Sequence, residues 1–595
     1  SIDEAMQAYP ELREKVRQPP DLQVWLTGGV PIFAEVNEVS EADLRRAEAL
    51  TLPLVLAALV LLFGGLVAAG LPVAMGAVSV AVTMALLYAL AQVTSISIFA
   101  MNLASLLGLG VAIDYSLVVV NRFREELATR PQAEAIAVTL ATAGRAILFS
   151  GATSVLGLAG LLLFEFMMLR SLGLGGILVI LVSMLVALTL LPALLMVVGR
   201  RVDALSLLRH RPAEGGMWSR LAWGVMRRPV LVALPLALLL LALGAPWASI
   251  LPPAAPARQG WEVVERELGP GELSPLVVVL QAPDGDWRET VGAAYDLTQR
   301  LRADPRVARV EGPIPPDPSL TREQAVALLR EPEQLPPPLR QAVAAFARED
   351  ILVVRAVTAL HPVSGEARAL VRELRAWDPG PGVASYVSGA TADLMDAVAE
   401  MYRDFPRVIL FVVGTVYLAL LLLFRSVVLP LKAVVMNSMS LFASFGALVY
   451  VFQQGHLQGP LGFRAEGFTE ATVPILLFCV VFGLSMDYEV FLLSRIKETY
   501  DETGDNTASV AVGLERTGRI ITSAALILVL VSAAFATSQV LVLKALGLGL
   551  ALAVFLDATV VRALLVPALM KVLGAWNWWA PAFLRRLLPD TRAAH

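Results

Sequence analysis

The sequence is poor in the side chains on which many soluble enzymes depend. It contains one cysteine, Cys479, and four histidines among 595 residues, and only 16% of its residues are charged. A single cysteine cannot form a disulfide within the chain. The histidines are scattered, without cysteines or carboxylates at the spacing of metal ligands. We therefore expect neither a metal centre nor a cofactor.

Motifs of other chemistries are missing as well. No G-x-x-x-x-G-K-[ST] stretch is present, which argues against a built-in P-loop ATPase, and there is no G-x-S-x-G nucleophile elbow. The basic residues fall in short loops rather than on one extended surface, so no nucleic-acid partner is predicted. These absences argue against enzyme catalysis and, together with the membrane spans described next, leave secondary active transport as the expected function.

Apolar residues, by contrast, make up 57% of the chain, and the mean hydropathy is +0.69. These values are typical of an α-helical polytopic membrane protein. Apolar runs of about 20 residues, the length that crosses a bilayer, predict eleven spans, at 51–70, 72–93, 96–120, 143–164, 172–198, 229–250, 406–425, 428–452, 471–493, 518–538 and 545–571.

The placement of lysine and arginine predicts the orientation of these spans. One set of loops is rich in them, with seven arginines between 200 and 228 and further basic residues at Arg122, Arg124, Arg130, Arg145, Arg495, Lys497, Arg516 and Arg519. The short loops opposite carry only Arg170, Arg464 and Lys544. Because cytoplasmic loops are enriched in these residues, the arginine-rich face and the C-terminal tail are predicted to be cytoplasmic. The polar stretches 1–50 and 251–403 are then extracytoplasmic.

The second polar stretch alternates strands and helices. Strands are predicted at 275–282, 306–312, 351–357 and 384–389, helices at 288–303 and 363–376, and short helical segments between 320 and 346. This repeated βαβ order is typical of an α+β ferredoxin-like sandwich.

The chain also contains a long internal repeat. The stretch from residue 26 parallels the stretch from 387, 141–154 parallels 515–528, and 190–199 parallels 565–574. Both copies run in the same direction, which predicts two parallel pseudo-symmetric halves. The first copy has five of the predicted spans and the second has six. We therefore expect that the chain begins part-way through the first copy, without one span and most of one outer domain.

Each copy places an aspartate and a tyrosine inside an apolar span, as Asp114–Tyr115 and Asp487–Tyr488. An ionised aspartate at the centre of a membrane helix costs roughly 2.5–3.5 kcal/mol, so it faces the bundle interior and finds a partner. In a parallel duplication, equivalent positions meet near the pseudo-twofold axis. We therefore expect each aspartate to bond the tyrosine of the other half, and we predict a proton relay of these four residues. Static hydrogen bonds that join the halves are the alternative.

Several residues are predicted to support this relay. Gly110 and Gly483 lie four residues before the aspartates, on the same helix face, where a bare glycine lets the opposing helix come close. Ser150, Ser154 and Ser523 are predicted to line a hydrated path, although small residues at helix interfaces explain them equally.

Two further pairs of charged residues have alternative interpretations. Arg122 and Arg495 each follow an aspartate by eight residues, and they act either as cytoplasmic anchors or in the relay. Asp557 and Arg562 in the last span lack charged counterparts in the first copy. They are predicted to form an intramembrane pair or to stabilise the cytoplasmic end of that span, rather than to form a second proton site.

The stretches "GVAIDYSLVVVNRFREE", "GLSMDYEVFLLSRIKE" and "LDATVVRALLVPALM", with the Gly-Arg motifs at 144–145 and 518–519, resemble the mycobacterial membrane protein large (MMPL) transporters of the resistance-nodulation-division (RND) superfamily. The resemblance covers nearly the whole chain. It implies twelve helices, two extracytoplasmic porter domains and export of lipids or other hydrophobic molecules, with protons as the coupling ion.

In the numbering of that family the chain divides as follows: 1–50, the end of the first porter domain; 51–200, transmembrane helices 2–6; 201–228, a cytoplasmic loop; 229–250, helix 7; 251–403, the second porter domain; 404–572, helices 8–12; and 573–595, a cytoplasmic tail. A cell-membrane, multi-pass protein is expected, and both a monomer and a trimer fit the sequence. The alternative function is a non-transporting assembly or sensing protein, either an accessory of protein secretion or a sensor of sterols or lipids.

Overall fold

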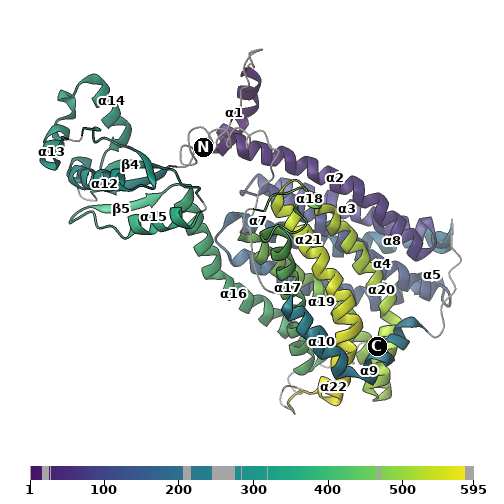
Figure 1. Cartoon of the computed structure of the whole chain (residues 1–595). Helices are drawn as coiled ribbons and strands as arrows, with labels where there is room; N and C mark the ends of the chain where they lie inside the picture. The colour runs from purple at the N-terminus through teal and green to yellow at the C-terminus, as the bar shows by residue number, and fades with distance from the viewer. Residues whose placement is uncertain are drawn as a thin grey trace. The chain divides into compact units, whose positions relative to one another are not determined.

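The structure is a computed structural model that describes residues 2–16, 26, 29–204, 216–243, 275–282, 285–317, 319–362, 364–465, 471–582 and 584 (Figure 1). The chain forms two compact units. The α+β unit comprises Ser1–Glu35 and Pro253–Glu400, and the helical unit comprises Val36–Pro252 and Met401–His595.

Ten helices in the described part of the chain are long and apolar enough to cross a membrane. Six are uninterrupted: α2 (Gly29–Phe63), α3 (Leu66–Ala91), α4 (Ile98–Leu127), α16 (Ala390–Phe424), α19 (Thr472–Thr503) and α20 (Asn506–Phe535). The other four contain a short change of helix type: α5–α6 (Gln132–Thr139, Arg145–Ala159), α7–α8 (Met167–Leu185, Leu191–Val198), α17 (Val428–Leu448) with its extension to Gln453, and α21–α22 (Leu541–Leu556, Val566–Leu573). The chain is therefore a multi-pass membrane protein.

The remaining predicted span, at 229–250, is described only in part. Its helix α10 (Pro229–Ala242) follows α9 (Met217–Arg227) at an angle of 93°. The bend falls at Arg228, where Pro229 opens α10. Proline has no backbone N–H and clashes with the preceding turn, so a helix seldom continues through it without a bend. The described residues thus contain ten candidate spans, or eleven if the bent pair counts as one.

One predicted boundary is wrong. A span was expected at 51–70, but α2 ends at Phe63 and α3 begins at Leu66. Gly64 separates them with φ of +74°, a left-handed conformation that glycine adopts at little cost. The apolar run continues through this turn, so hydropathy alone could not locate it.

The backbone confirms the internal repeat. Helices α2 and α16 are both 35 residues long and begin at matching positions of the two copies. Helices α8 and α22 are both eight residues long. Each ends at a glycine with nearly the same conformation, φ 54° and ψ −131° at Gly199 and φ 53° and ψ −125° at Gly574. The two halves therefore repeat the same helices in the same order.

Among the described helices, four spans contain a π-helical segment: 140–144, 186–190, 449–453 and 557–565. The segments at 186–190 and 557–565 occupy corresponding places, just before α8 and α22. In a π-turn the hydrogen bonds join residues five apart, and such turns occur often at functional sites. The longest of these segments, with nine residues, contains both Asp557 and Arg562.

The α+β unit contains an antiparallel sheet whose strand order is β2-β4-β1-β5. Its elements are β1 (Leu276–Gln281), α12 (Val291–Ala303), β2 (Val307–Glu311), α13 (Arg322–Arg330), α14 (Pro337–Phe346), β3 (Ala347–Arg348), β4 (Ile351–Thr358), α15 (Gly365–Arg375) and β5 (Ala384–Ser388). The short strand β3 pairs with β4. Apart from β3, this is the split βαβ order that the sequence predicted.

The core of this unit lies on one face of the sheet. Alternate residues of β1, namely Leu276, Val278 and Leu280, are buried together with residues of α12 and α15 such as Leu297 and Leu370. This alternation follows from the two-residue period of a strand. The helix α1 (Ile2–Lys15) also belongs to the unit. Because the stretch from residue 26 parallels the stretch from 387, the first copy is also expected to have a strand and a glycine turn before α2. These lie within residues 17–28, of which only residue 26 is described.

Candidate functional site

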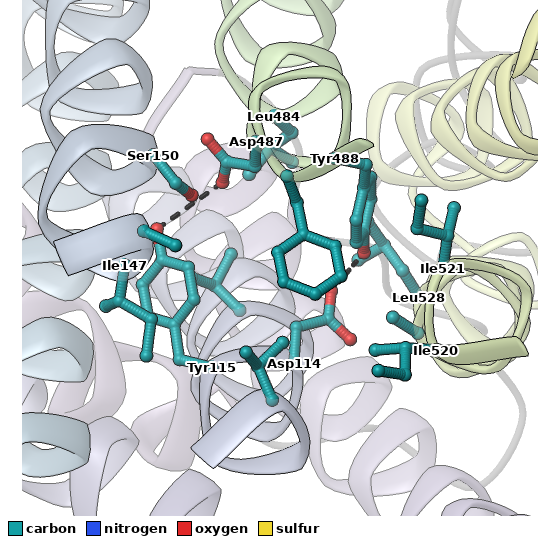
Figure 2. A pocket seen from close by; sticks show the side chains of 15 residues that line it. Asp114, Tyr115, Ile147, Ser150, Leu484, Asp487, Tyr488, Ile520, Ile521 and Leu528 are labelled. Atoms are coloured by element: carbon teal, nitrogen blue, oxygen red, sulfur yellow. Dashed lines mark hydrogen bonds between the residues drawn. The ribbon is translucent and has the colours of Figure 1, made fainter. Parts of the chain in front are cut away.

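The two aspartate–tyrosine motifs meet across the two halves, as predicted (Figure 2). Helix α4 carries Asp114 and Tyr115, and α19 carries Asp487 and Tyr488. The Tyr488 hydroxyl donates a hydrogen bond to Asp114 Oδ2, and the Tyr115 hydroxyl donates to Asp487 Oδ2 at 3.4 Å. Each of these two hydrogen bonds therefore joins residues more than 370 positions apart in the sequence.

These four side chains line one small cavity. It holds about 40 Å³ of space that water could occupy, which is room for at least one water molecule. The rest of its wall is mainly apolar: Val111, Val118, Ala146, Ile147, Ser150, Leu484, Phe491, Ile520, Ile521, Ala524 and Leu528. The carboxyl groups of Asp114 and Asp487 therefore line the same, mainly apolar cavity within the helical unit.

The helices of the Gly-Arg motifs, α6 and α20, bring the halves together. Helix α19 packs closely on α6 of the first half, and α4 packs on α20 of the second half. Gly110 lies against Leu528 of α20, and Gly483 lies against the backbone of Ser154 in α6. Both glycines permit a close approach, as predicted. The helix that approaches them, however, is the neighbour of the other half's aspartate helix rather than that helix itself.

The backbones of the two halves also approach closely at Gly157 of α6. A Cβ atom there would lie 2.8 Å from Gly483 Cα and 3.0 Å from the carbonyl oxygen of Cys479. Both neighbours are backbone atoms, which cannot turn aside as a side chain can. The crossing therefore requires glycine on both helices.

We expect Gly157→Ala to destabilise the protein by about 1–3 kcal/mol, the usual cost of overpacking. Gly414→Ala is the matched control, since a Cβ at Gly414 in α16 would meet no atom within 4 Å. Thermal unfolding in detergent measures both variants. A Gly157→Ala protein as stable as the Gly414→Ala protein would contradict the close crossing.

The predicted serines behave differently from one another. Ser154 donates to Asp487 Oδ1 at 2.7 Å, and Ser150 lines the cavity beside Tyr115 and Asp487 (Figure 2). Ser523 was predicted to line the path as well, but it does not line this cavity. Its hydroxyl bonds the carbonyl of Arg519 in its own helix at 2.7 Å, and it is not part of the cavity wall. A serine in a helix can satisfy itself in this way, one turn back.

The two aspartates consequently have unequal surroundings. Both oxygens of Asp487 accept a hydrogen bond, from Ser154 and Tyr115. Asp114 accepts one from Tyr488, and its Oδ1 has no partner among the described residues. In the aligned repeat, Leu528 stands where the first copy has Ser154. Asp487 therefore has a serine donor, Ser154, whereas the residue at the equivalent position beside Asp114 is a leucine.

Asp557 and Arg562 form a buried ion pair, as predicted. Arg562 Nε lies 2.9 Å from Asp557 Oδ2, and both residues are at most 3% exposed. Ser485 Oγ lies 2.7 Å from the same carboxylate oxygen and 2.9 Å from Asn437 Oδ1. The guanidinium carbon of Arg562 lies 4.9 Å from the centre of the Tyr488 ring. A polar network therefore adjoins the aspartate site on one side.

This network is confined to the second half. The sequence indicated Asp557 and Arg562 but missed Asn437 and Ser485. It also missed Lys432 of α17, whose Nζ lies 3.9 Å from Glu489 Oε1 with both side chains almost fully buried. A signal for all three was present: they are polar residues within apolar spans, and the first-copy residues aligned with Asn437, Ser485 and Lys432 are Gly76, Ala112 and Leu71.

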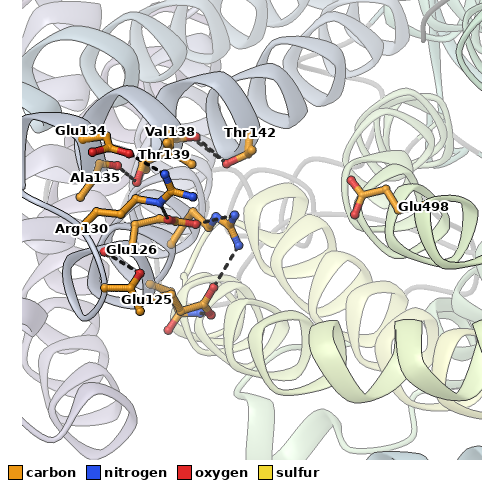
Figure 3. Close-up of polar contacts among 12 residues, drawn as sticks. Glu125, Glu126, Arg130, Glu134, Ala135, Val138, Thr139, Thr142 and Glu498 are labelled. Carbon is orange, nitrogen blue, oxygen red and sulfur yellow. Dashed lines mark hydrogen bonds and ion pairs between the residues drawn. The ribbon is translucent and has the colours of Figure 1, made fainter. Parts of the chain in front are cut away.

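Arg122 and Arg495 contact acidic residues of their own helices. Arg122 pairs with Glu126 at 2.6 Å, and Arg495 pairs with Glu498 at 2.8 Å. Figure 3 shows that Glu126 also contacts Arg130, at 2.7 Å. The hydrogen bonds that the Arg130 guanidinium donates to Glu134 and Glu126 raise the pKa of Arg130. These contacts fit the interpretation of both arginines as anchors.

Comparison with known proteins adds independent information. A model of the MMPL family matches residues 1–232 and 249–589. The chain is 38% identical, over 95% of its length, to a membrane protein of Streptomyces coelicolor. It is 34% identical, over 98% of its length, to the mycolic acid-containing lipids exporter MmpL11 of Mycolicibacterium smegmatis. It is 35% identical, over 96% of its length, to the trehalose monomycolate exporter MmpL3 of Mycobacterium tuberculosis.

The matched proteins are longer than this chain. The alignments cover 75% of the Streptomyces protein, 61% of the Mycolicibacterium exporter and 64% of the Mycobacterium exporter. The similarity thus extends over nearly all of this chain but over less than two thirds of the two named exporters.

Proposed function

Because the chain belongs to the MMPL family, we propose that it exports lipids or other hydrophobic molecules out of the cytoplasmic membrane, driven by the proton-motive force. The main support is the cavity in which Asp114 and Asp487 each accept a hydrogen bond from a tyrosine of the other half. The names of two relatives, which are lipid exporters, support the substrate class.

The geometry suggests how a proton would change the protein. An ionised carboxylate only accepts hydrogen bonds, whereas a protonated one also donates. Gain of a proton at Asp487 would therefore rearrange its bonds to Ser154 and Tyr115, which come from α6 and α4 of the other half. Protonation at Asp114 would change its bond to Tyr488 in the same way. Each event alters contacts that join the two halves.

The energy available per proton is sufficient for such a change. One charge that crosses a potential of 100 mV releases about 2.3 kcal/mol. Coupling between conformations typically involves about 1–3 kcal/mol. Proton release on the arginine-rich face, predicted to be cytoplasmic, would couple inward proton movement to outward movement of lipid.

Lipid flux in proteoliposomes tests this proposal. The full-length protein is reconstituted with a panel of labelled lipids, with and without an imposed proton gradient. We expect lipid release to an external acceptor to require the gradient and to stop when an ionophore dissipates it. Equal release with and without the gradient would refute proton coupling. Absence of release for every lipid would favour the assembly or sensing function.

A further inference from the structure

Asp43 of α2 bonds the connection between two helices of the other half, α20 and α21. Its carboxylate is only 4% exposed, and it accepts three hydrogen bonds at Oδ2 from the connection between α20 and α21. The donors are the Ser538 hydroxyl at 2.6 Å and the backbone N–H groups of Gln539 at 2.6 Å and Val540 at 3.2 Å. A side chain of the first half thus holds the beginning of α21 in the second half.

This contact adds to a local bond at the start of α21, in which the Val540 N–H donates to Ser538 Oγ at 3.0 Å. Val540, the residue before α21, makes no capping hydrogen bond with its side chain. The N–H groups at the start of a helix have no partner inside that helix, and a carboxylate interacts favourably with the positive end of the helix dipole. Asp43 supplies both the acceptor and the charge. It therefore fixes the position of α2 relative to α21.

The internal repeat places a second aspartate at the equivalent position. In the alignment in which residue 26 matches 387, Asp43 matches Asp404 of α16, and Arg46 matches Arg407. Helix α7, which matches α21, also begins without a side-chain cap, at Phe166. The first half therefore contains the same carboxylate and the same uncapped helix.

The second contact, however, is not made. Asp404 is buried, and the hydrogen bonds found for it among the described residues come from Arg403 at 3.4 Å and Arg407 at 3.5 Å. It lines a hollow of about 430 Å³ with Leu163 and Glu165, at the connection between α6 and α7. The carboxylate is thus close to the helix that it could cap, but it bonds arginines of its own helix.

The regions around Asp43 and Asp404 are each connected to the aspartate site through one helix. Helix α20, which precedes the Asp43 contact, provides Ile520, Ala524 and Leu528 to the cavity wall. Helix α6, which precedes the Asp404 hollow, carries Ser154, the hydrogen-bond donor to Asp487. A shift of α6 or α20 at its connection to the next helix would therefore move side chains that surround Asp114 and Asp487.

We infer that Asp43 and Asp404 are paired latches, one for each half, which alternately tie α2 to the start of α21 and α16 to the start of α7. The structure shows the Asp43 latch closed and the Asp404 latch open. The inference rests on the proposed transport cycle, since only a cycle requires the second latch to close. Both aspartates act as positioning residues, and neither contacts the aspartate–tyrosine site directly.

Distance measurements between spin labels test this inference in the full-length protein in lipid nanodiscs. Cys479, the only cysteine, is first replaced by alanine. One label pair at Glu41 and Thr537 reports the Asp43 latch, and the equivalent pair at Tyr402 and Leu163 reports the Asp404 latch. All four positions are exposed. We expect a narrow, short distance for the first pair and a longer one for the second.

Variants of the latches should shift these distances in opposite directions. Asp43→Ala removes the acceptor and should lengthen and broaden the Glu41–Thr537 distance. Asp43→Asn keeps an oxygen acceptor and should preserve that distance. The double substitution Arg403→Gln with Arg407→Gln frees Asp404 and should add a short population to the Tyr402–Leu163 distance. This double variant also tests the inference if the Asp43→Ala protein does not fold.

An imposed proton gradient across liposomes should add the same short population for the Tyr402–Leu163 pair. An unchanged Glu41–Thr537 distance in the Asp43→Ala protein would overturn the role of Asp43. A single long Tyr402–Leu163 distance under every condition would overturn the alternation. Lipid flux in the same samples separates the two proposals. Exchange of distances without flux contradicts export, and proton-driven flux without exchange contradicts the latches.

Discussion

Asp114→Asn and Asp487→Asn are each expected to reduce proton-driven lipid export by about 10²-fold, toward the upper end of the roughly 5–150-fold range that coupling energies of 1–3 kcal/mol produce. Asparagine keeps the size of aspartate and can still accept the tyrosine hydrogen bond, but its amide cannot take up and release a proton as a carboxyl group does. Insertion and folding should survive, since the substitution removes a costly charge from the membrane. Flux in proteoliposomes with a fixed proton gradient measures the effect.

The tyrosine variants separate the relay from static hydrogen bonding. Tyr115→Phe and Tyr488→Phe should lower export less, by about the 5-fold that marks the weak end of coupling, because the carboxyl groups remain. If the contacts only hold the halves together, the order reverses, because asparagine can still bond a tyrosine and phenylalanine cannot. Ser523→Ala is the matched control, since Ser523 bonds only its own helix. Full proton-driven flux in a well-folded Asp487→Asn protein would exclude the relay.

Arg562→Ala is expected to destabilise the protein by about 3–5 kcal/mol, the cost of leaving one member of a buried ion pair without its partner. Asp557 would then be a buried carboxylate that retains only the Ser485 hydroxyl. Arg495→Gln is the control, since Arg495 and Glu498 form a half-exposed pair, and such pairs contribute only about 0–1 kcal/mol. Thermal unfolding of purified protein measures both.

A second variant distinguishes stability from function at this pair. Asp557→Val with Arg562→Ala reproduces Val182 and Ala187, the aligned residues of the first copy. Apolar replacement of a whole buried pair is often neutral or stabilising, so most of the lost stability should return. Export should stay low, because Arg562 also approaches the Tyr488 ring of the aspartate site. Recovery of both stability and export would show that the pair is structural only.

The agreement between sequence and structure was closest where local patterns determine the outcome. The two-residue and 3.6-residue periods located the strands and helices of the α+β unit to within a few residues, and the βαβ order then left one common sheet topology. Apolar length located most spans. The repeat predicted that Asp114 and Asp487 would meet the tyrosines of the opposite halves, because a parallel duplication relates equivalent positions by an axis.

Details that depend on which helix lies next to which were not predictable in this way. The turn at Gly64 lies inside an unbroken apolar run. Asp557 and Arg562 are five residues apart, a spacing that an α-helix places on different faces, and they meet within a π-helical segment. Ser154 and Ser523 look alike in sequence, yet only Ser154 faces a carboxylate.

The sequence by itself determined that this protein is a duplicated membrane protein with an aspartate inside an apolar span of each copy, because hydropathy, charge and repetition are properties of the chain read in order. Only the tertiary structure decided which contacts differ between the two halves. It showed that Asp487 has one more donor than Asp114, that a polar network adjoins one side of the site, and that Asp43 caps a helix of the other half while Asp404 does not. The physical reason is that a hydrogen bond acts over about 3 Å, so it depends on the helix that folding brings alongside and not on distance along the sequence.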